Sequence, residues 1–235
     1  MKPVFVYTQN VKNFTNAMEI VKKRMGHDSL AMVSGRAGRG KTRTALYYAT
    51  QNDCVYLTTL RDWSVLWMYQ DILSAMGFAK DTQPKRKKHA FEAILQASAD
   101  DPKPIILDEA DLLGQRLLES VRDLCKMMRV PWVLVGEESL YGLMSRDRRV
   151  WSRSCAWMEF LPMSVADIVT FCGQAADLKI STNTAENIQK KTGGDIRLIE
   201  LLVSTAENIA KANNTKQITD DIAQAAIKRV MPEAK

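Results

Sequence analysis

A glycine-rich stretch that ends in lysine and threonine carries the clearest chemical signal in the chain. Eight consecutive residues satisfy the pattern G-x-x-x-x-G-K-[ST]: Gly35, Arg36, Ala37, Gly38, Arg39, Gly40, Lys41 and Thr42. The glycines let the backbone turn tightly, so that its N–H groups converge on the phosphates of a nucleotide. Lys41 adds a positive charge at the β- and γ-phosphates, and Thr42 supplies a hydroxyl to Mg²⁺. The stretch predicts a phosphate-binding loop (P-loop) for ATP and Mg²⁺.

Two adjacent carboxylates follow a second apolar stretch. Asp108 and Glu109 come directly after residues 105–107, which are Ile, Ile and Leu. With a P-loop upstream, Asp108 is expected to hold the Mg²⁺, usually through water, and Glu109 to orient and polarise the attacking water. The alternative is that both are solvated acids at the start of a helix near Ala110. The P-loop upstream favours the hydrolytic interpretation.

These groups need a scaffold of strands and helices to position them. Residues 30–33 form a short apolar run before the P-loop, and residues 42–50 are expected to form the helix after it. Further strands are predicted at 54–57, 105–107, 133–135 and 157–161, and further helices at 11–25, 66–76, 91–95 and 117–125. Strands that alternate with helices imply an α/β fold, with a five-stranded parallel sheet covered on both faces.

The pattern becomes entirely helical after Pro162. Helices are predicted at 164–176, 183–191, 195–212 and 219–230. Asp195 and Thr219 are expected N-caps, and the Gly193-Gly194 pair should interrupt the chain between two helices. We therefore expect two domains, an α/β domain over 1–162 and a small all-helical domain over 163–235.

Composition bounds the class of protein. The 235 residues are 46% hydrophobic and 26% charged, enough for one P-loop core with an appendage. A net charge of +6 permits a polyanionic partner without requiring one. The four cysteines form no C-x-x-C pair and the two histidines lie far apart, so no zinc site is expected. Scattered cysteines are typical of a reducing compartment. No apolar run suits a signal peptide or a membrane span, so we expect a cytoplasmic protein.

Taken together, these features resemble the AAA+ ATPases. The P-loop, the run Leu107-Asp108-Glu109-Ala110-Asp111 and the helical C-terminal part carry a resemblance that spans nearly the whole chain. Within that superfamily the sequence is most similar to the transposition ATPases, the group of the phage Mu B protein and the target-selection ATPases of related transposons. The cues are short motifs: Thr8-Gln9-Asn10, Val135-Gly136-Glu137 and Gly193-Gly194-Asp195-Ile196-Arg197.

The resemblance implies roles for residues outside the P-loop. It makes the helical domain a lid, in which Arg197 matches the arginine that senses the γ-phosphate; the alternative is an exposed helix arginine. The family normally has a polar sensor, often Asn or Thr, at the end of the fourth strand. Glu137 stands nearest to that position here, with Glu138 beside it. This departure argues against an ordinary sensor and suggests that an acid tunes or slows hydrolysis.

The family also implies an arginine that reaches the nucleotide of a neighbouring subunit. Four arginines precede the fifth predicted strand: Arg146, Arg148, Arg149 and Arg153. Such a finger neutralises charge in the transition state and makes hydrolysis depend on assembly. Any of the four could serve; we favour Arg149 or Arg153, and expect the others to be solvated surface charges.

A dense basic run predicts contact with nucleic acid. It consists of Lys85, Arg86, Lys87 and Lys88. Adjacent cations suit a phosphate backbone, although a solvated connector is the alternative. The resemblance favours DNA, because related ATPases line a central channel with this region; Arg61 and Trp63 could face the same channel, and the Trp63 ring could equally be core. No base-reading motif is present, so we expect largely sequence-independent binding to double-stranded DNA.

The combined hypothesis is an ATPase that forms an ATP-bound ring or helical filament on target DNA. The family implies that the assembly recruits the transposase and that hydrolysis disassembles it. One rival is a motor of the secretion or remodelling type that acts on a protein partner. The other is a non-hydrolysing, nucleotide-gated binding module, against which Glu109 argues.

Overall fold

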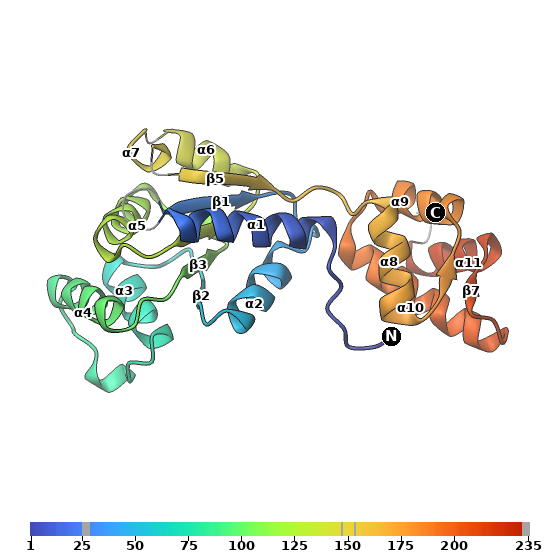
Figure 1. Cartoon of the computed structure of the whole chain (residues 1–235), viewed down its shortest axis with the longest axis horizontal. Helices are drawn as coiled ribbons and strands as arrows, with labels where there is room; N and C mark the ends of the chain where they lie inside the picture. The colour runs from blue at the N-terminus through green and yellow to red at the C-terminus, as the bar shows by residue number, and fades with distance from the viewer. Residues whose placement is uncertain (25–28, 147, 153, 232–235) are drawn as a thin grey trace. The chain divides into compact units, whose positions relative to one another are not determined.

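The chain folds into two compact units. The computed structural model describes residues 1–24, 29–146, 148–152 and 154–231 (Figure 1). The α/β unit consists of Asn13–Arg36 and Lys41–Glu159. The helical unit consists of Met1–Lys12, Ala37–Gly40 and Phe160–Lys235, so the tip of the P-loop groups with the helical unit. None of the helices among the described residues combines the length and the apolar character that crossing a membrane requires.

The α/β unit is built on a parallel sheet. Its strands are β1 (Leu30–Ser34), β2 (Val55–Thr58), β3 (Ile105–Asp108), β4 (Trp132–Val135) and β5 (Ser154–Glu159). All neighbours pair in parallel in the order β2-β3-β4-β1-β5. The predicted five-stranded parallel sheet is therefore confirmed, although β5 begins earlier than the strand predicted at 157–161.

Helices of the α/β unit follow the strands in the alternation that a parallel sheet demands. They are α1 (Gln9–Lys23, shared with the helical unit), α2 (Lys41–Gln51), α3 (Val65–Ala75), α4 (Lys87–Asp100), α5 (Gln115–Met128), α6 (Ser139–Arg146) and α7 (Arg148–Trp151). Two 3₁₀ turns, η1 (Lys80–Thr82) and η2 (Ala110–Leu112), join them. The helix predicted at 91–95 is longer and starts at Lys87, and α6 and α7 were not predicted.

The two faces of the sheet carry different helices. On one face, Leu57, Ile105, Leu107 and Leu134 are buried in one core with apolar side chains of α3, α4, α5 and α6. Side chains alternate along a strand, so the intervening residues of β3 point to the opposite face, against which α2 packs. Asp108, the last residue of β3, lies on this second face, which is also the side of the helix that follows the P-loop.

As far as Met231, where the described residues end, the C-terminal part of the helical unit contains four helices and one short strand pair. They are α8 (Val165–Ala176), β6 (Lys179–Ile180), α9 (Thr182–Thr192), α10 (Ile196–Ala212), β7 (Gln217–Ile218) and α11 (Asp220–Val230). Both predicted N-caps are confirmed: Asp195 Oδ1 accepts from the N–H of Arg197 at 2.8 Å, and Thr219 Oγ1 from that of Ile222 at 3.4 Å. The predicted interruption at Gly193-Gly194 is also confirmed, since both residues have positive φ.

Candidate nucleotide-binding site

Lys41 lies at the junction of the P-loop and α2. It is the first residue of α2, so the predicted order of strand, glycine-rich loop and helix is confirmed. The side chain is buried, and Nζ donates hydrogen bonds to the carbonyl oxygens of Gly35 at 2.6 Å and Arg36 at 2.9 Å. The ammonium is thereby held against the start of its own loop, at the positive end of the α2 dipole. Thr42 follows it with an exposed side chain.

The tip of the loop is bonded to the start of α10 within the helical unit. Gly38 and Gly40 have φ of 76° and 88°, which only glycine adopts without strain. The Ile196 N–H donates to the Gly38 carbonyl at 2.8 Å, and Arg39 Nη1 donates to the Gly193 carbonyl at 2.7 Å. Arg39, predicted as part of the phosphate cradle, therefore directs its guanidinium at the Gly193 turn, while the loop backbone remains available as the cradle itself.

Replacing Gly38 with alanine should destabilise the loop tip. A Cβ at this position would collide with the Asp195 carboxylate, and the positive φ adds about 1 kcal/mol of backbone strain. We expect Gly38→Ala to lower the melting temperature by about 2–4 °C per kcal/mol lost and to weaken binding of a fluorescent ATP analogue. Gly173→Ala is the control, because Gly173 lies in helix α8 with open space at its Cβ. A Gly38→Ala variant with unchanged melting and affinity would contradict the close packing.

Asp108 is a buried carboxylate held by two hydrogen-bond donors. It is 2% exposed, and the Tyr56 hydroxyl donates to its Oδ2 at 2.8 Å. The backbone N–H of Glu109 donates to Oδ1 at 2.9 Å. Burial, and to a lesser degree the bond to Asp108, raises the pKa of Tyr56, so the hydroxyl is a proton donor at neutral pH. The sequence pointed to Asp108 but not to Tyr56, because only the pairing of β2 with β3 brings the two together.

The oxygen atoms of Asp108 and Thr42 fit a hard divalent cation such as Mg²⁺. Within the described part of the chain Asp108 has no ion-pair partner, although burying an uncompensated carboxylate is costly. A bound cation would offset that cost. Carboxylate and hydroxyl oxygens are the ligands that Mg²⁺ prefers, and Asp108 faces the side of the sheet covered by α2, the helix that carries Thr42 near its start.

Glu109 is an exposed carboxylate on a strained backbone. Its φ of 53° and ψ of 34° place it in the left-handed region, which costs a non-glycine residue about 1 kcal/mol or more. Its side chain makes no capping hydrogen bond to the single 3₁₀ turn η2 that follows. The interpretation of Glu109 as a helix-capping acid is therefore not supported, and an exposed carboxylate beside a buried one is free to meet a water molecule.

Glu137 and Glu138 follow β4, near the position where a polar sensor was expected. Glu137 is exposed, and its N–H donates to Asp111 Oδ1 at 2.8 Å. Asp111 packs so closely that a Cβ at Gly136 would lie 2.5 Å from the same oxygen. Glu138 forms a 3.5 Å ion pair with Arg36, and both are exposed, so the pair contributes little stability. Asp111 thus fixes the backbone of Gly136 and Glu137 after β4, and the carboxylate of Glu137 lies in solvent.

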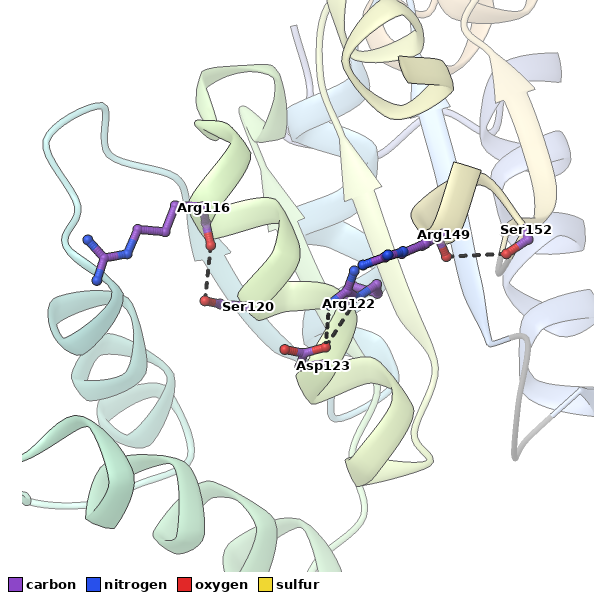
Figure 2. A network of polar contacts seen from close by, with 6 residues as sticks. All are labelled: Arg116, Ser120, Arg122, Asp123, Arg149 and Ser152. Atoms are coloured by element: carbon purple, nitrogen blue, oxygen red, sulfur yellow. Dashed lines mark hydrogen bonds and ion pairs between the residues drawn. The ribbon is translucent and has the colours of Figure 1, made fainter. Parts of the chain in front are cut away.

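Figure 2 shows where one of the predicted finger arginines lies. Arg149, in α7, directs its side chain toward Arg122 of α5, whose Nη2 forms a 2.8 Å ion pair with Asp123. The Ser152 hydroxyl donates to the Arg149 carbonyl at 3.3 Å. Arg146 and Arg148 are exposed at the junction of α6 and α7, and Arg153 lies outside the described residues. The geometry therefore does not single out one finger.

Arg197 is the second residue of α10 in the helical unit. Its backbone N–H is fixed by the Asp195 cap, and its side chain is exposed. Within the described residues its guanidinium forms no ion pair. The N–H of Ile196, the preceding residue, donates to the Gly38 carbonyl at the tip of the P-loop. The backbone of Arg197 is therefore held close to the loop tip.

The basic run lies at the start of α4. Lys85, Arg86, Lys87 and Lys88 are all exposed, and the first turn of α4 contains no acidic residue. Cations at this end of a helix are opposed by its dipole, and the 3.7 Å ion pair of Lys88 with Glu92 joins two exposed side chains, so the run contributes little to the stability of α4. Before the run, Gln83 Nε2 donates to Ser74 Oγ at 2.7 Å. The connector is therefore tied to α3 rather than loose.

The loop after β2 carries the other predicted DNA contact. Arg61 is exposed there, on a different loop from the basic run. Trp63 is 6% exposed, and its Nε1 donates to Asp71 Oδ2 at 2.8 Å. The core interpretation of Trp63 is thus correct, and Arg61 alone of the two is accessible.

Comparisons with known proteins agree with this geometry. The family model described as "AAA domain" matches residues 23–144, about half of the chain. The "ATP-dependent target DNA activator B" of Escherichia phage Mu is 32% identical over 149 residues, covering 63% of this chain and 46% of the relative. The "Mu-like prophage FluMu DNA transposition protein B" of Haemophilus influenzae is 25% identical over 227 residues, covering 92% and 75%.

A solved structure shares the fold. Cdc6p from Pyrobaculum aerophilum matches with a TM-score of 0.74 at 16% identity, covering all of this chain and 71% of that one. The chain spans about half the length of the Mu relative it matches. The P-loop between β1 and α2, the sheet order and the family match agree: the chain belongs to the AAA domain family, and the Mu-type target DNA activators are among its relatives.

Proposed function

We propose that this protein is an ATPase that binds target DNA for transposition. The observation that carries the ATPase part is the carboxylate pair at the end of β3. Asp108 is buried on the sheet face covered by the helix that follows the P-loop, and Glu109, the next residue, is exposed. The DNA part is supported by the relatives, whose names specify a target DNA activator and a DNA transposition protein. We assign 1–162 to the nucleotide-binding domain and 163–235 to the lid.

Each group of site residues has a stated role in this proposal. The backbone of Gly35–Thr42 cradles the phosphates, and Lys41 places its charge on the β- and γ-phosphates. Thr42 and Asp108 would hold Mg²⁺, which bridges phosphate oxygens and neutralises charge that develops there. Glu109 orients and polarises the attacking water. Arg197 senses the γ-phosphate.

Assembly is the second part of the proposal. An arginine of the 146–153 segment completes the nucleotide site of a neighbouring subunit, which couples hydrolysis to a ring or filament on DNA. In this scheme the ATP-bound assembly marks target DNA and recruits the transposase, and hydrolysis releases it. The exposure of Arg146 and Arg148 supports a role at such a contact.

Electron microscopy of the protein with duplex DNA, in ATP and in ADP, tests assembly, DNA binding and nucleotide gating together. We expect ordered particles on DNA with ATP and their loss with ADP. ATPase assays with and without duplex DNA complete the test. Stimulation by a protein partner, with no response to DNA, would instead favour the remodelling-type motor.

Removing the basic run should weaken DNA binding and flatten its salt dependence. Changing Lys85, Arg86, Lys87 and Lys88 to glutamine removes exposed cations that suit a phosphate backbone. Each lost phosphate contact should lower the slope of log affinity against log salt by about 0.9. We expect roughly uniform weakening across DNA sequences, measured by fluorescence anisotropy at several salt concentrations.

A matched control removes the same charge elsewhere. Lys190, Lys191, Lys228 and Arg229 are exposed on α9 and α11 of the helical unit. Their change to glutamine lowers the net charge equally and should leave the salt slope nearly unchanged. Equal effects from both sets would mean that overall charge, and not the start of α4, governs binding.

A further inference from the structure

Tyr56 stands beside Asp108 on the neighbouring strand. In the parallel pairing of β2 with β3, Tyr56 is opposite Ile106 and Thr58 is opposite Asp108. Side chains two residues apart share a face, so Tyr56 and Thr58 lie on the same face of the sheet as Asp108. The Tyr56 hydroxyl reaches across to donate to Asp108 Oδ2 at 2.8 Å.

The hydroxyl of Tyr56 is itself oriented. Its partner is the carboxylate of Asp108, and Thr58 is the next residue on that face of β2. Tyr56 is only half-exposed, and its ring is fixed on a sheet strand rather than on a loop. A hydroxyl on a fixed ring that donates to Asp108 Oδ2 directs its proton at that carboxylate.

The hydrogen bonds to Asp108 still leave room for a cation. Each carboxylate oxygen has two acceptor sites, and one donor occupies each oxygen, Tyr56 at Oδ2 and the Glu109 N–H at Oδ1. The remaining lone pairs can accept from the water shell of Mg²⁺. Partners of this kind fix the orientation of a metal-binding carboxylate, and their loss typically costs 10–100-fold in metal affinity.

We propose that Tyr56 is a positioning residue for Mg²⁺, which holds the Asp108 carboxylate in the orientation that receives the hydrated ion beside the nucleotide. This inference rests on the proposed role of Asp108. It adds a residue from a third element, β2, to a site otherwise built from the P-loop and β3. Tyr56 itself touches neither nucleotide nor metal in this scheme.

The experiment measures how binding of a fluorescent ATP analogue to the whole chain depends on MgCl₂. Tyr56→Phe keeps the ring and removes only the hydroxyl. We expect binding of the analogue in EDTA to stay within about twofold of the original protein, while the MgCl₂ concentration for half-maximal enhancement rises about tenfold. Tyr141→Phe removes a hydroxyl from an exposed side chain of α6 and should change neither quantity.

Asp108→Asn separates the two levels of the hypothesis. If it shifts the MgCl₂ dependence and Tyr56→Phe does not, the inference about Tyr56 is wrong while Asp108 keeps its role. If neither shifts it, the proposed Mg²⁺ role of Asp108 fails, and the inference with it. Equal weakening by Tyr56→Phe with and without MgCl₂, or a lower melting temperature that accounts for the loss, would also overturn the inference, because it would indicate a packing role.

Discussion

Replacing Lys41 with methionine is expected to weaken ATP binding by about 10- to 100-fold and to abolish measurable hydrolysis. A hydrogen bond to a charged group contributes about 1.5–3 kcal/mol, and the phosphates lose such a partner in this variant. Methionine keeps the unbranched stem that is buried at the start of α2, so the effect should come from the ammonium. Isothermal titration with ATP and a phosphate-release assay measure the two quantities.

The control for Lys41→Met is a methionine substitution of another basic residue, two positions later. Arg43 lies on α2 with an exposed side chain, and Arg43→Met changes the net charge equally. We expect this control to bind ATP like the original protein. Nζ of Lys41 also bonds the Gly35 and Arg36 carbonyls, so melting temperatures must be compared. Normal ATP affinity in a stably folded Lys41→Met variant would refute the predicted contact with the phosphates.

Replacing Glu109 with glutamine should stop hydrolysis and leave ATP binding intact. Glutamine has nearly the same shape, so the backbone N–H that supports Asp108 remains in place. Loss of a general base typically costs about 10²–10⁴-fold in rate. We expect ATP affinity within about threefold of the original and a rate of phosphate release lowered by at least 100-fold. As a consequence, the ATP-bound assembly should remain on DNA for longer, which single-molecule residence times would measure.

Glu119→Gln is the matched control for this prediction. Glu119 is exposed on α5, ten residues after Glu109, and loses the same charge. It should hydrolyse ATP at the original rate and leave DNA at the original rate. Unaltered hydrolysis and unaltered DNA residence in Glu109→Gln would show that Glu109 does not activate the water. Slower hydrolysis without longer residence would instead separate catalysis from disassembly.

Much of the secondary structure could be predicted from the sequence, because the patterns that specify strands and helix caps involve neighbouring residues. The apolar runs before Gly35 and Asp108 predicted buried strands, and both are strands. Asp195 and Thr219 cap the helices they were expected to cap, since capping depends on neighbouring backbone N–H groups. The resemblance to transposition-type AAA+ ATPases rested on similar short motifs and is confirmed by the family match and the Mu-type relatives.

Side-chain contacts were harder to predict, because they depend on partners far away in sequence. Arg39 belongs to the P-loop motif, yet its guanidinium bonds the Gly193 carbonyl, 154 residues later. Trp63 could have faced a DNA channel or the core, and its ring is buried in the core. The helices α6 and α7 were missed although they carry three of the candidate finger arginines, since their short apolar patterns are weak.

The chemical parts of this protein can be identified from the amino-acid sequence alone: a phosphate loop, a carboxylate pair, apolar strands, and capped helices after them. Each of these depends on a few consecutive residues. Which parts meet depends on the folded chain. The order β2-β3-β4-β1-β5 places Tyr56 against Asp108 and sets Asp108 on the α2 face, and no local pattern specifies strand order. The physical reason is that strand pairing depends on contacts between residues far apart in sequence, and these contacts exist only in the folded chain.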